Sequence, residues 1–122
     1  SSWSSSSASY VATPLQGTIT PSSTSNKVLV MMNSVVDTSA ASRTPTLMIY
    51  RNSTAVSSAS EGLMQAMDRG AGTRFPFSIH WLDSPNSTSA VTYRLYAKCG
   101  AAFEMPPYAS LDAQVTMLEV KG

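Results

Sequence analysis

The chain has little of what builds most catalytic and metal sites. Its 122 residues include one cysteine, Cys99, and one histidine, His80. A single cysteine excludes an intrachain disulfide and a thiolate metal cluster, and a single histidine excludes a metal site built from several imidazoles. The fold must therefore be stable through the packing of its side chains, and we expect neither a metal nor a cofactor.

Charge is also scarce. Charged residues make up 12% of the chain, about half the share of an average globular protein, and the formal net charge is +1. No basic cluster stands out along the sequence, so we expect no contact with nucleic acid. No apolar run approaches the roughly 18 residues that span a bilayer, so we also expect no membrane insertion.

Length and composition indicate one folded domain. Residues 1–9 read SSWSSSSAS, a low-complexity stretch that contains Trp3 and that we interpret as a serine-rich arm or connector. From residue 10 onward, short segments of strand-forming residues alternate with turn formers. We therefore place a single domain at residues 10–122, long enough to bury one core.

The folded part reads as a series of short strands. Pro14 within the first of them indicates an edge strand. About eight strands, with no convincing helix of ten or more residues, predict an all-β fold, a two-sheet antiparallel β-sandwich. The expected strands are 10–15, 17–20, 27–36, 46–51, 61–69, 74–82, 90–99 and 113–122.

Segments 27–36 and 46–51 break the alternation that a two-layer sandwich requires. Each sheet of a sandwich has one face toward the core and one toward water, yet both faces of these segments are apolar. Burying one large aliphatic side chain stabilises a protein by about 1.5–3 kcal/mol, so the second face should also be covered. A second copy of the chain is the favoured cover, and a segment such as Trp3 with the serine-rich arm is the alternative. The candidates for a subunit interface are Leu29, Met31, Val35, Met48 and Tyr50.

Four segments carry a resemblance to a known family: PLQGTITPSSTSNKVLV, LMIYRNSTAV, TYRLYAKCG and AQVTMLEVKG. They resemble the C-terminal jelly-roll domain, of the tumour necrosis factor type, found in virion proteins such as the tail fibres and related appendages of marine bacteriophages. The resemblance covers about residues 10–122, and the arm with Trp3 departs from it. It implies a jelly-roll fold, a homotrimer, a location in the virion and contacts with other virion proteins.

The sequence offers no constellation of residues for catalysis. His80 falls on the less apolar face of an alternating strand, so we interpret it as an ordinary strand residue. The aspartates at 37, 68, 83 and 112 fall at expected strand ends or in loops, where aspartate stabilises turns. We interpret Cys99 as a small buried hydrophobe. We therefore expect no enzymatic activity and no catalytic residue.

The expected function is that of a structural virion protein. It would be a trimeric fibre or appendage domain that takes part in virion assembly and in attachment to a host-surface glycan or protein. One alternative is a capsid decoration or head-fibre module that contacts only virion proteins, and another is a carbohydrate-binding domain. Sugars stack on exposed aromatic rings, and the candidates for such contacts are Phe103 and Tyr108, in a loop expected at 100–112.

Overall fold

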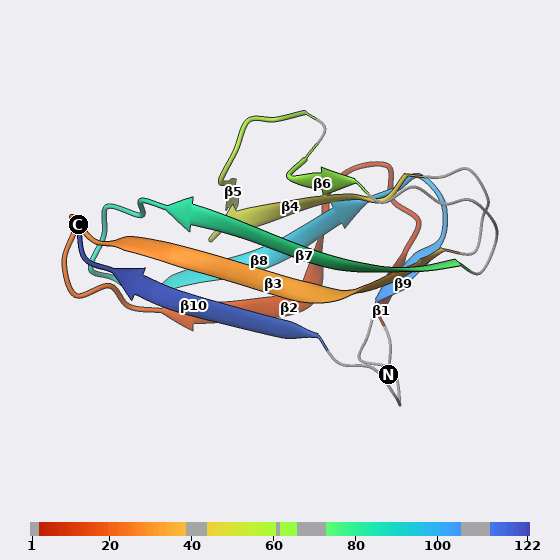
Figure 1. Ribbon diagram of the computed structural model, residues 1–122. Coiled ribbons are helices and arrows are strands. Elements are labelled where there is room, and N and C mark those ends of the chain that lie inside the picture. Colours follow the sequence, from red (N-terminus) through yellow and green to blue (C-terminus); the bar gives the residue numbers. More distant parts are fainter. Residues whose placement is uncertain (1–2, 39–43, 61, 66–72, 106–112) are drawn as a thin grey trace.

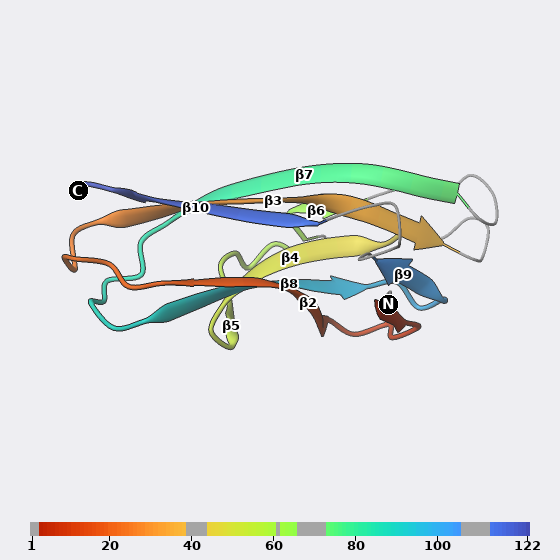
Figure 2. The same cartoon turned by 90° about the horizontal axis from the view of Figure 1, so that it is seen from below.

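The computed structural model describes residues 3–38, 44–60, 62–65, 73–105 and 113–122. Within these residues the chain forms ten β-strands in two antiparallel sheets. The sheets pack face to face as two layers (Figure 1 and Figure 2). None of these residues forms a helix long and apolar enough to cross a membrane. The expected all-β, two-sheet sandwich is confirmed.

Sheet A has β3 at its centre. One edge of β3 pairs with β7 along its length, while the other pairs first with β10 and then, at its last two residues, with β9. β1 adds to the outer side of β9. The strands of sheet A are β7 (Thr73–Asp83), β3 (Lys27–Thr38), β10 (Gln114–Val120), β9 (Phe103–Met105) and β1 (Trp3–Ser5).

Sheet B has β8 at its centre, between β2 and β4. The short strands β5 and β6 pair with opposite ends of β4. Its strands are β2 (Val11–Ile19), β8 (Val91–Lys98), β4 (Thr46–Arg51), β5 (Thr54–Ala55) and β6 (Met64–Gln65). The long strands β2, β3, β4, β7, β8 and β10 alternate between the two sheets, so neighbours within a sheet are distant in sequence, as in a jelly roll.

The core lies between the sheets and is filled by every second residue of the long strands. Strand β8 shows this most clearly, because buried and partly buried residues alternate along its whole length. The aromatic and aliphatic side chains of both sheets meet there. The buried core residues are Val28, Val30, Met32, Val36, Leu47, Ile49, Phe77, Ile79, Val91, Tyr93, Leu95, Ala97, Phe103 and Met105.

The serine-rich stretch that we expected to be an arm or connector contributes to the sandwich. Trp3–Ser5 forms β1, and the ring of Trp3 meets that of Phe103 edge to face, with 5.6 Å between the ring centres. The backbone amides of Cys99 and Gly100 donate hydrogen bonds to the carbonyl of Ser7, at 2.9 and 3.1 Å. Residues 3–7 are therefore held against the domain by pairing, packing and backbone hydrogen bonds.

Strand β2 forms an edge of sheet B, as Pro14 indicated. The register between β2 and β8 shifts between Ala12 and Gln16, and the exposed Pro14 lies within this bulge. Thr13 beside it is fully buried, and its hydroxyl donates to the carbonyl of Leu95 at 2.8 Å. A bulge with a proline interrupts the unpaired edge, a common protection against pairing with another chain.

Gly17 lets β2 lie close to β10 of the opposite sheet. A Cβ atom at Gly17 would lie 2.7 Å from the Cε of Met117 and 3.3 Å from a methyl group of Val115. Both atoms belong to side chains that pack against the core. The missing side chain of Gly17 therefore makes room for the inner face of β10.

We expect Gly17→Val to lower the free energy of unfolding by roughly 1–3 kcal/mol, because the added methyl groups overpack this contact. Gly17→Ala should cost less, because the terminal methyl of Met117 can rotate away. Urea unfolding measures both, and Gln16→Ala, at an exposed neighbouring position, is the control. A Gly17→Val variant as stable as the wild type would contradict the close approach.

Candidate functional site: an apolar sheet face

The outer face of sheet A carries a strip of apolar side chains. The register places Leu29 of β3 between Leu118 of β10 and Leu82 of β7, so three leucines form a row across the sheet. Leu82 and Leu118 are 50% and 52% exposed. Met31 follows on β3, and Val120 follows on β10 with 39% exposure. We call these five residues the apolar strip.

Charged groups are absent from the centre of this strip. The neighbours of Met31 across the sheet are Thr116 and His80. Lys27 lies opposite Val120, at one end of the strip. Copies of this surface can therefore approach one another without repulsion between like charges.

The alternation of apolar residues in the sequence identified Leu29 and Met31 of β3 as surface candidates. It missed the other members of the strip, which are Leu82, Leu118 and Val120. Leu29, Met31 and Val35 lie on the face opposite the core and are partly buried, as expected. Val35 lies apart from the strip, opposite Pro76. Leu82 follows Ser78 and His80 on the outer side of β7, and Leu118 follows Thr116 on that of β10. Only the register of three strands brings the two leucines beside Leu29. No local signal marks that register.

On the outer face of sheet B, Met48 is already buried within a single chain, so the expectation that it needs a partner subunit is wrong. Met48 is 2% exposed in a single chain, opposite Tyr96. The ring of Tyr96 stacks on that of Tyr50 with 3.7 Å between ring centres. Tyr10 meets Tyr50 edge to face at 6.1 Å, with its hydroxyl close to Gly62. Tyr50 therefore belongs to an intrachain cluster of rings with Tyr10 and Tyr96.

The candidate sugar contact at Phe103 is also wrong. Phe103 is 2% exposed and lies in β9, where a loop was expected. Its ring packs against Trp3 in the core, so it offers no free face to a ligand. Tyr108, the second candidate, lies outside the described residues.

The titratable side chains that catalysis would need are spread over the described part of the chain. His80 is exposed on the outer face of β7, and Cys99 is partly buried. Asp37 lies opposite Glu104 in the pairing of β3 with β9. Among residues that the structure describes, no three side chains of histidine, cysteine, aspartate or glutamate come together as a metal site would require. Asp68 and Asp112 lie outside those residues.

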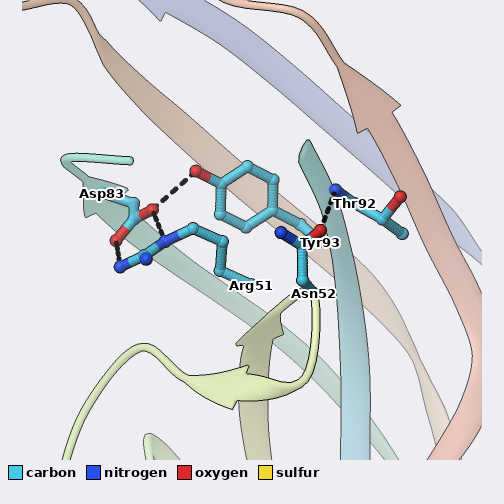
Figure 3. Close-up of polar contacts among 5 residues, drawn as sticks. All are labelled: Arg51, Asn52, Asp83, Thr92 and Tyr93. Atoms are coloured by element: carbon cyan, nitrogen blue, oxygen red, sulfur yellow. Dashed lines mark hydrogen bonds and ion pairs between the residues drawn. The ribbon is translucent and has the colours of Figure 1, made fainter. Parts of the chain in front are cut away.

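One buried carboxylate joins the two sheets. Asp83, the last residue of β7, is 4% exposed and faces two side chains of sheet B (Figure 3). Its Oδ2 accepts hydrogen bonds from Arg51 Nε at 2.7 Å and from the hydroxyl of Tyr93 at 2.6 Å. Its Oδ1 accepts a third bond from Arg51 Nη2 at 3.3 Å. We expected Asp83 to stabilise a turn, but it forms an ion pair with Arg51 between the layers.

Asn52 fixes the turn that follows Arg51. Its φ of 54° is left-handed, a conformation that asparagine adopts more readily than most residues. The amide of Asn52 donates to the carbonyl of Thr92 at 2.7 Å. The side-chain oxygen of Asn52 accepts from the amide of Thr92 at 3.0 Å (Figure 3). The turn is thereby attached to β8 next to Tyr93, which holds Arg51 beside Asp83.

The buried position sets the protonation of this network. Burial raises the pKa of the Tyr93 hydroxyl, and its hydrogen bond to Asp83 raises it further. The hydrogen bond to the Asp83 carboxylate, assisted by its charge, raises the pKa of Arg51. Tyr93 therefore stays neutral and Arg51 charged at neutral pH, and the network acts as a structural connection between the sheets.

Tyr93→Phe should lower the free energy of unfolding by about 1.5–3 kcal/mol at neutral pH, because it removes a hydrogen bond to a carboxylate without changing the ring. Tyrosine in the unfolded chain ionises near pH 10, whereas folded Tyr93 ionises higher, so wild-type stability falls as pH rises above about 10. The variant lacks this contribution. The difference between the two proteins should thus shrink from about pH 9 to about pH 11 in urea unfolding. A constant difference would contradict the raised pKa.

Glu119 connects the turn at residues 20–26 to the end of β10. Its Oε2 accepts hydrogen bonds from the amide of Ser22 at 3.0 Å, from the Ser22 hydroxyl at 2.6 Å and from the side-chain amide of Asn26. The amide of Gly122 donates to the side-chain oxygen of Asn26 at 3.2 Å. The bond from the Ser22 hydroxyl, followed by those from the two amides, lowers the pKa of Glu119. These contacts join the first and the last of the four segments that carry the family resemblance.

The lowered pKa of Glu119 can be observed at Ser22. The carboxylate stabilises the folded turn above the ordinary glutamate pKa of about 4.3, and this contribution is lost as pH falls through the lower pKa of the folded state. The NMR shift of the Ser22 amide should therefore titrate with a midpoint below about 4.3. Glu119→Gln should abolish the titration. A midpoint at the ordinary value would contradict the bonded carboxylate.

Comparison of the chain with protein-family models, with curated proteins and with solved structures found no match in any of the three. The function proposed below therefore rests on the residues and the geometry of this chain, together with the resemblance of its four segments.

Proposed function

We propose that this protein is a non-enzymatic structural protein of a bacteriophage virion, a trimeric fibre or appendage domain that acts through assembly. The observation that carries the proposal is the apolar strip on the outer face of sheet A. The outer face of sheet B buries its corresponding residue, Met48, under the chain itself, whereas the strip leaves Leu82 and Leu118 half exposed. The strip is the surface that other copies would cover.

Covering the strip would favour association through the hydrophobic effect. Burying the exposed half of Leu82 or Leu118 contributes roughly 1 kcal/mol each, and Leu29, Met31 and Val120 add to this. In a closed assembly every subunit covers its strip once, so the total gain is the sum over the subunits. The choice of three subunits, and of the virion as the location, comes from the family resemblance.

Contact with a host-surface glycan or protein would be a further function of such an appendage. Of the alternatives, a capsid decoration module would use the same strip against other virion proteins. A carbohydrate-binding domain has less support, because Phe103 is buried and the rings of Tyr50 and Tyr96 stack on each other.

Met31→Asp should dissociate the assembly, because it places an uncompensated charge in a covered boundary at a cost of several kcal/mol. Light scattering or sedimentation should give a mass near three chains for the wild type and a lower mass for the variant. Gln16→Asp, which adds the same charge at an exposed position of β2, is the control and should keep the wild-type mass.

A second variant tests the same assembly at a more exposed position, in case Met31→Asp prevents the chain from folding. Leu118→Asp changes a half-exposed residue of an outer strand, so it should keep the circular dichroism of the wild type and still lower the mass. A well-folded wild-type monomer at micromolar concentration would overturn the proposed assembly.

A further inference from the structure

Strand β7 presents one complete edge that no other described strand occupies. β3 pairs with all eleven residues of β7, and it is the one described strand that pairs with β7 at all. An unpaired edge exposes a row of amide and carbonyl groups that can hydrogen-bond to another strand. β7 is thus a site to which a strand could be added.

Pro76 shows which residues of β7 point to that edge. The register with β3 passes through Pro76, opposite Val35, without a shift. Proline has no amide hydrogen, so in such a ladder its nitrogen must face away from β3. Alternate residues of an antiparallel strand point their backbone groups to the same side. Ser78, His80 and Leu82 therefore direct their amides and carbonyls to the free edge.

Pro76 is one protective feature of this edge, but the edge beyond it lacks the other features that usually prevent pairing. Residues 75–82 contain no lysine, arginine, aspartate or glutamate, and the register with β3 shows no bulge. By contrast, the edge strand β2 has a bulge with Pro14. A long, regular, uncharged edge is the type that pairs with another chain.

A groove beside the edge adds an apolar surface. It has a volume of about 310 Å³ and lies between β7 and the segment of sheet B that contains β6. Leu63, Met64 and Trp81 line it, and all three are partly buried and pack against the core. Side chains of an added strand could enter this groove.

We propose that β7 of one copy pairs antiparallel with β7 of a second copy, around a twofold axis at Ile79. In this register Phe77 faces Trp81 of the other copy on the inner side, and Ser78 faces His80 on the outer side. Like-charged side chains do not meet, and aromatic cross-strand pairs stabilise sheets. Sheet A then continues across the boundary, while the apolar strip stays available on its outer face.

The area that two β7 edges would bury agrees with a weak but specific interface. Residues 76–82 span about 24 Å, and a sandwich is roughly 20 Å thick with its side chains, which gives about 500 Å² per copy and about 1,000 Å² in total. This is the lower end for specific interfaces. The edge contact goes beyond the proposed function and uses a different surface, so either can fail without the other.

Disulfide trapping tests the register. In a chain with Cys99→Ser, the pair Ser78→Cys and His80→Cys should form disulfides between copies, because opposed residues lie within disulfide reach. Denaturing, non-reducing mass analysis should then show two linked chains. A chain with only one of the two cysteines should give no linked pair. In this register each cysteine is displaced by two residues along the strand from the same cysteine of the other copy. No linkage in the double variant, or linkage by His80→Cys alone, would overturn the arrangement.

Removal of one amide provides a second test. Ser78→Pro deletes an amide at the free edge and leaves the ladder to β3 intact, whereas Ser78→Ala keeps that amide. In the Met31→Asp background, which removes contacts through the strip, sedimentation should show a concentration-dependent pair for Ser78→Ala and a single chain for Ser78→Pro. Equal masses for the two variants would overturn the proposal.

Discussion

The sandwich depends on β3, which is hydrogen-bonded along both edges and apolar on both faces. A strand of this kind gives a weak hydrophobic signal for its register, because a shift by one residue exchanges one apolar face for the other. Asn33 resolves the ambiguity. It is exposed on the outer face, opposite Ser78 on one side and Gln114 on the other. A shift by one residue would turn Asn33 into the core and leave its amide without water.

The long strands were predictable because their signal is local. Period-two alternation in β7, β8 and β10 fixed both their existence and their inner faces, and the bounds of β4 agree with the expected 46–51. The short strands β1 and β9 were not predictable, because three residues rich in serine or followed by prolines carry no period. Their structure comes from pairing with each other, and from the contact of Trp3 with Phe103, one hundred residues away in the sequence. The contact of Tyr10 with Tyr50 was hidden for the same reason.

The candidate site shows the same division between local and distant information. Leu29 and Met31 were identifiable from one strand, whereas Leu82 and Leu118 became neighbours of Leu29 only through the registers of β7 and β10. The polar connections are equally non-local: Asp83 lies 32 residues from Arg51, and Glu119 lies 97 residues from Ser22. Both carboxylates lie where β7 and β10 end, on the side of the C-terminus (Figure 1). That end of the sandwich is therefore held by hydrogen bonds as well as by packing.

The alternation of the chain between the two layers has a kinetic consequence. Each pair of long strands joins segments that are far apart in the sequence. β2 can pair only after β8 has been made, and β3 at the centre of sheet A can complete its pairing only after β10 has been made. Closing such long loops costs conformational entropy before the contacts between the strands can offset that cost, so folds of this type reach their native state slowly. During synthesis, β3 leaves the ribosome before either of its long partners exists. Its two apolar faces are then exposed together, at the stage when a nascent chain is most open to misassembly and most in need of a chaperone.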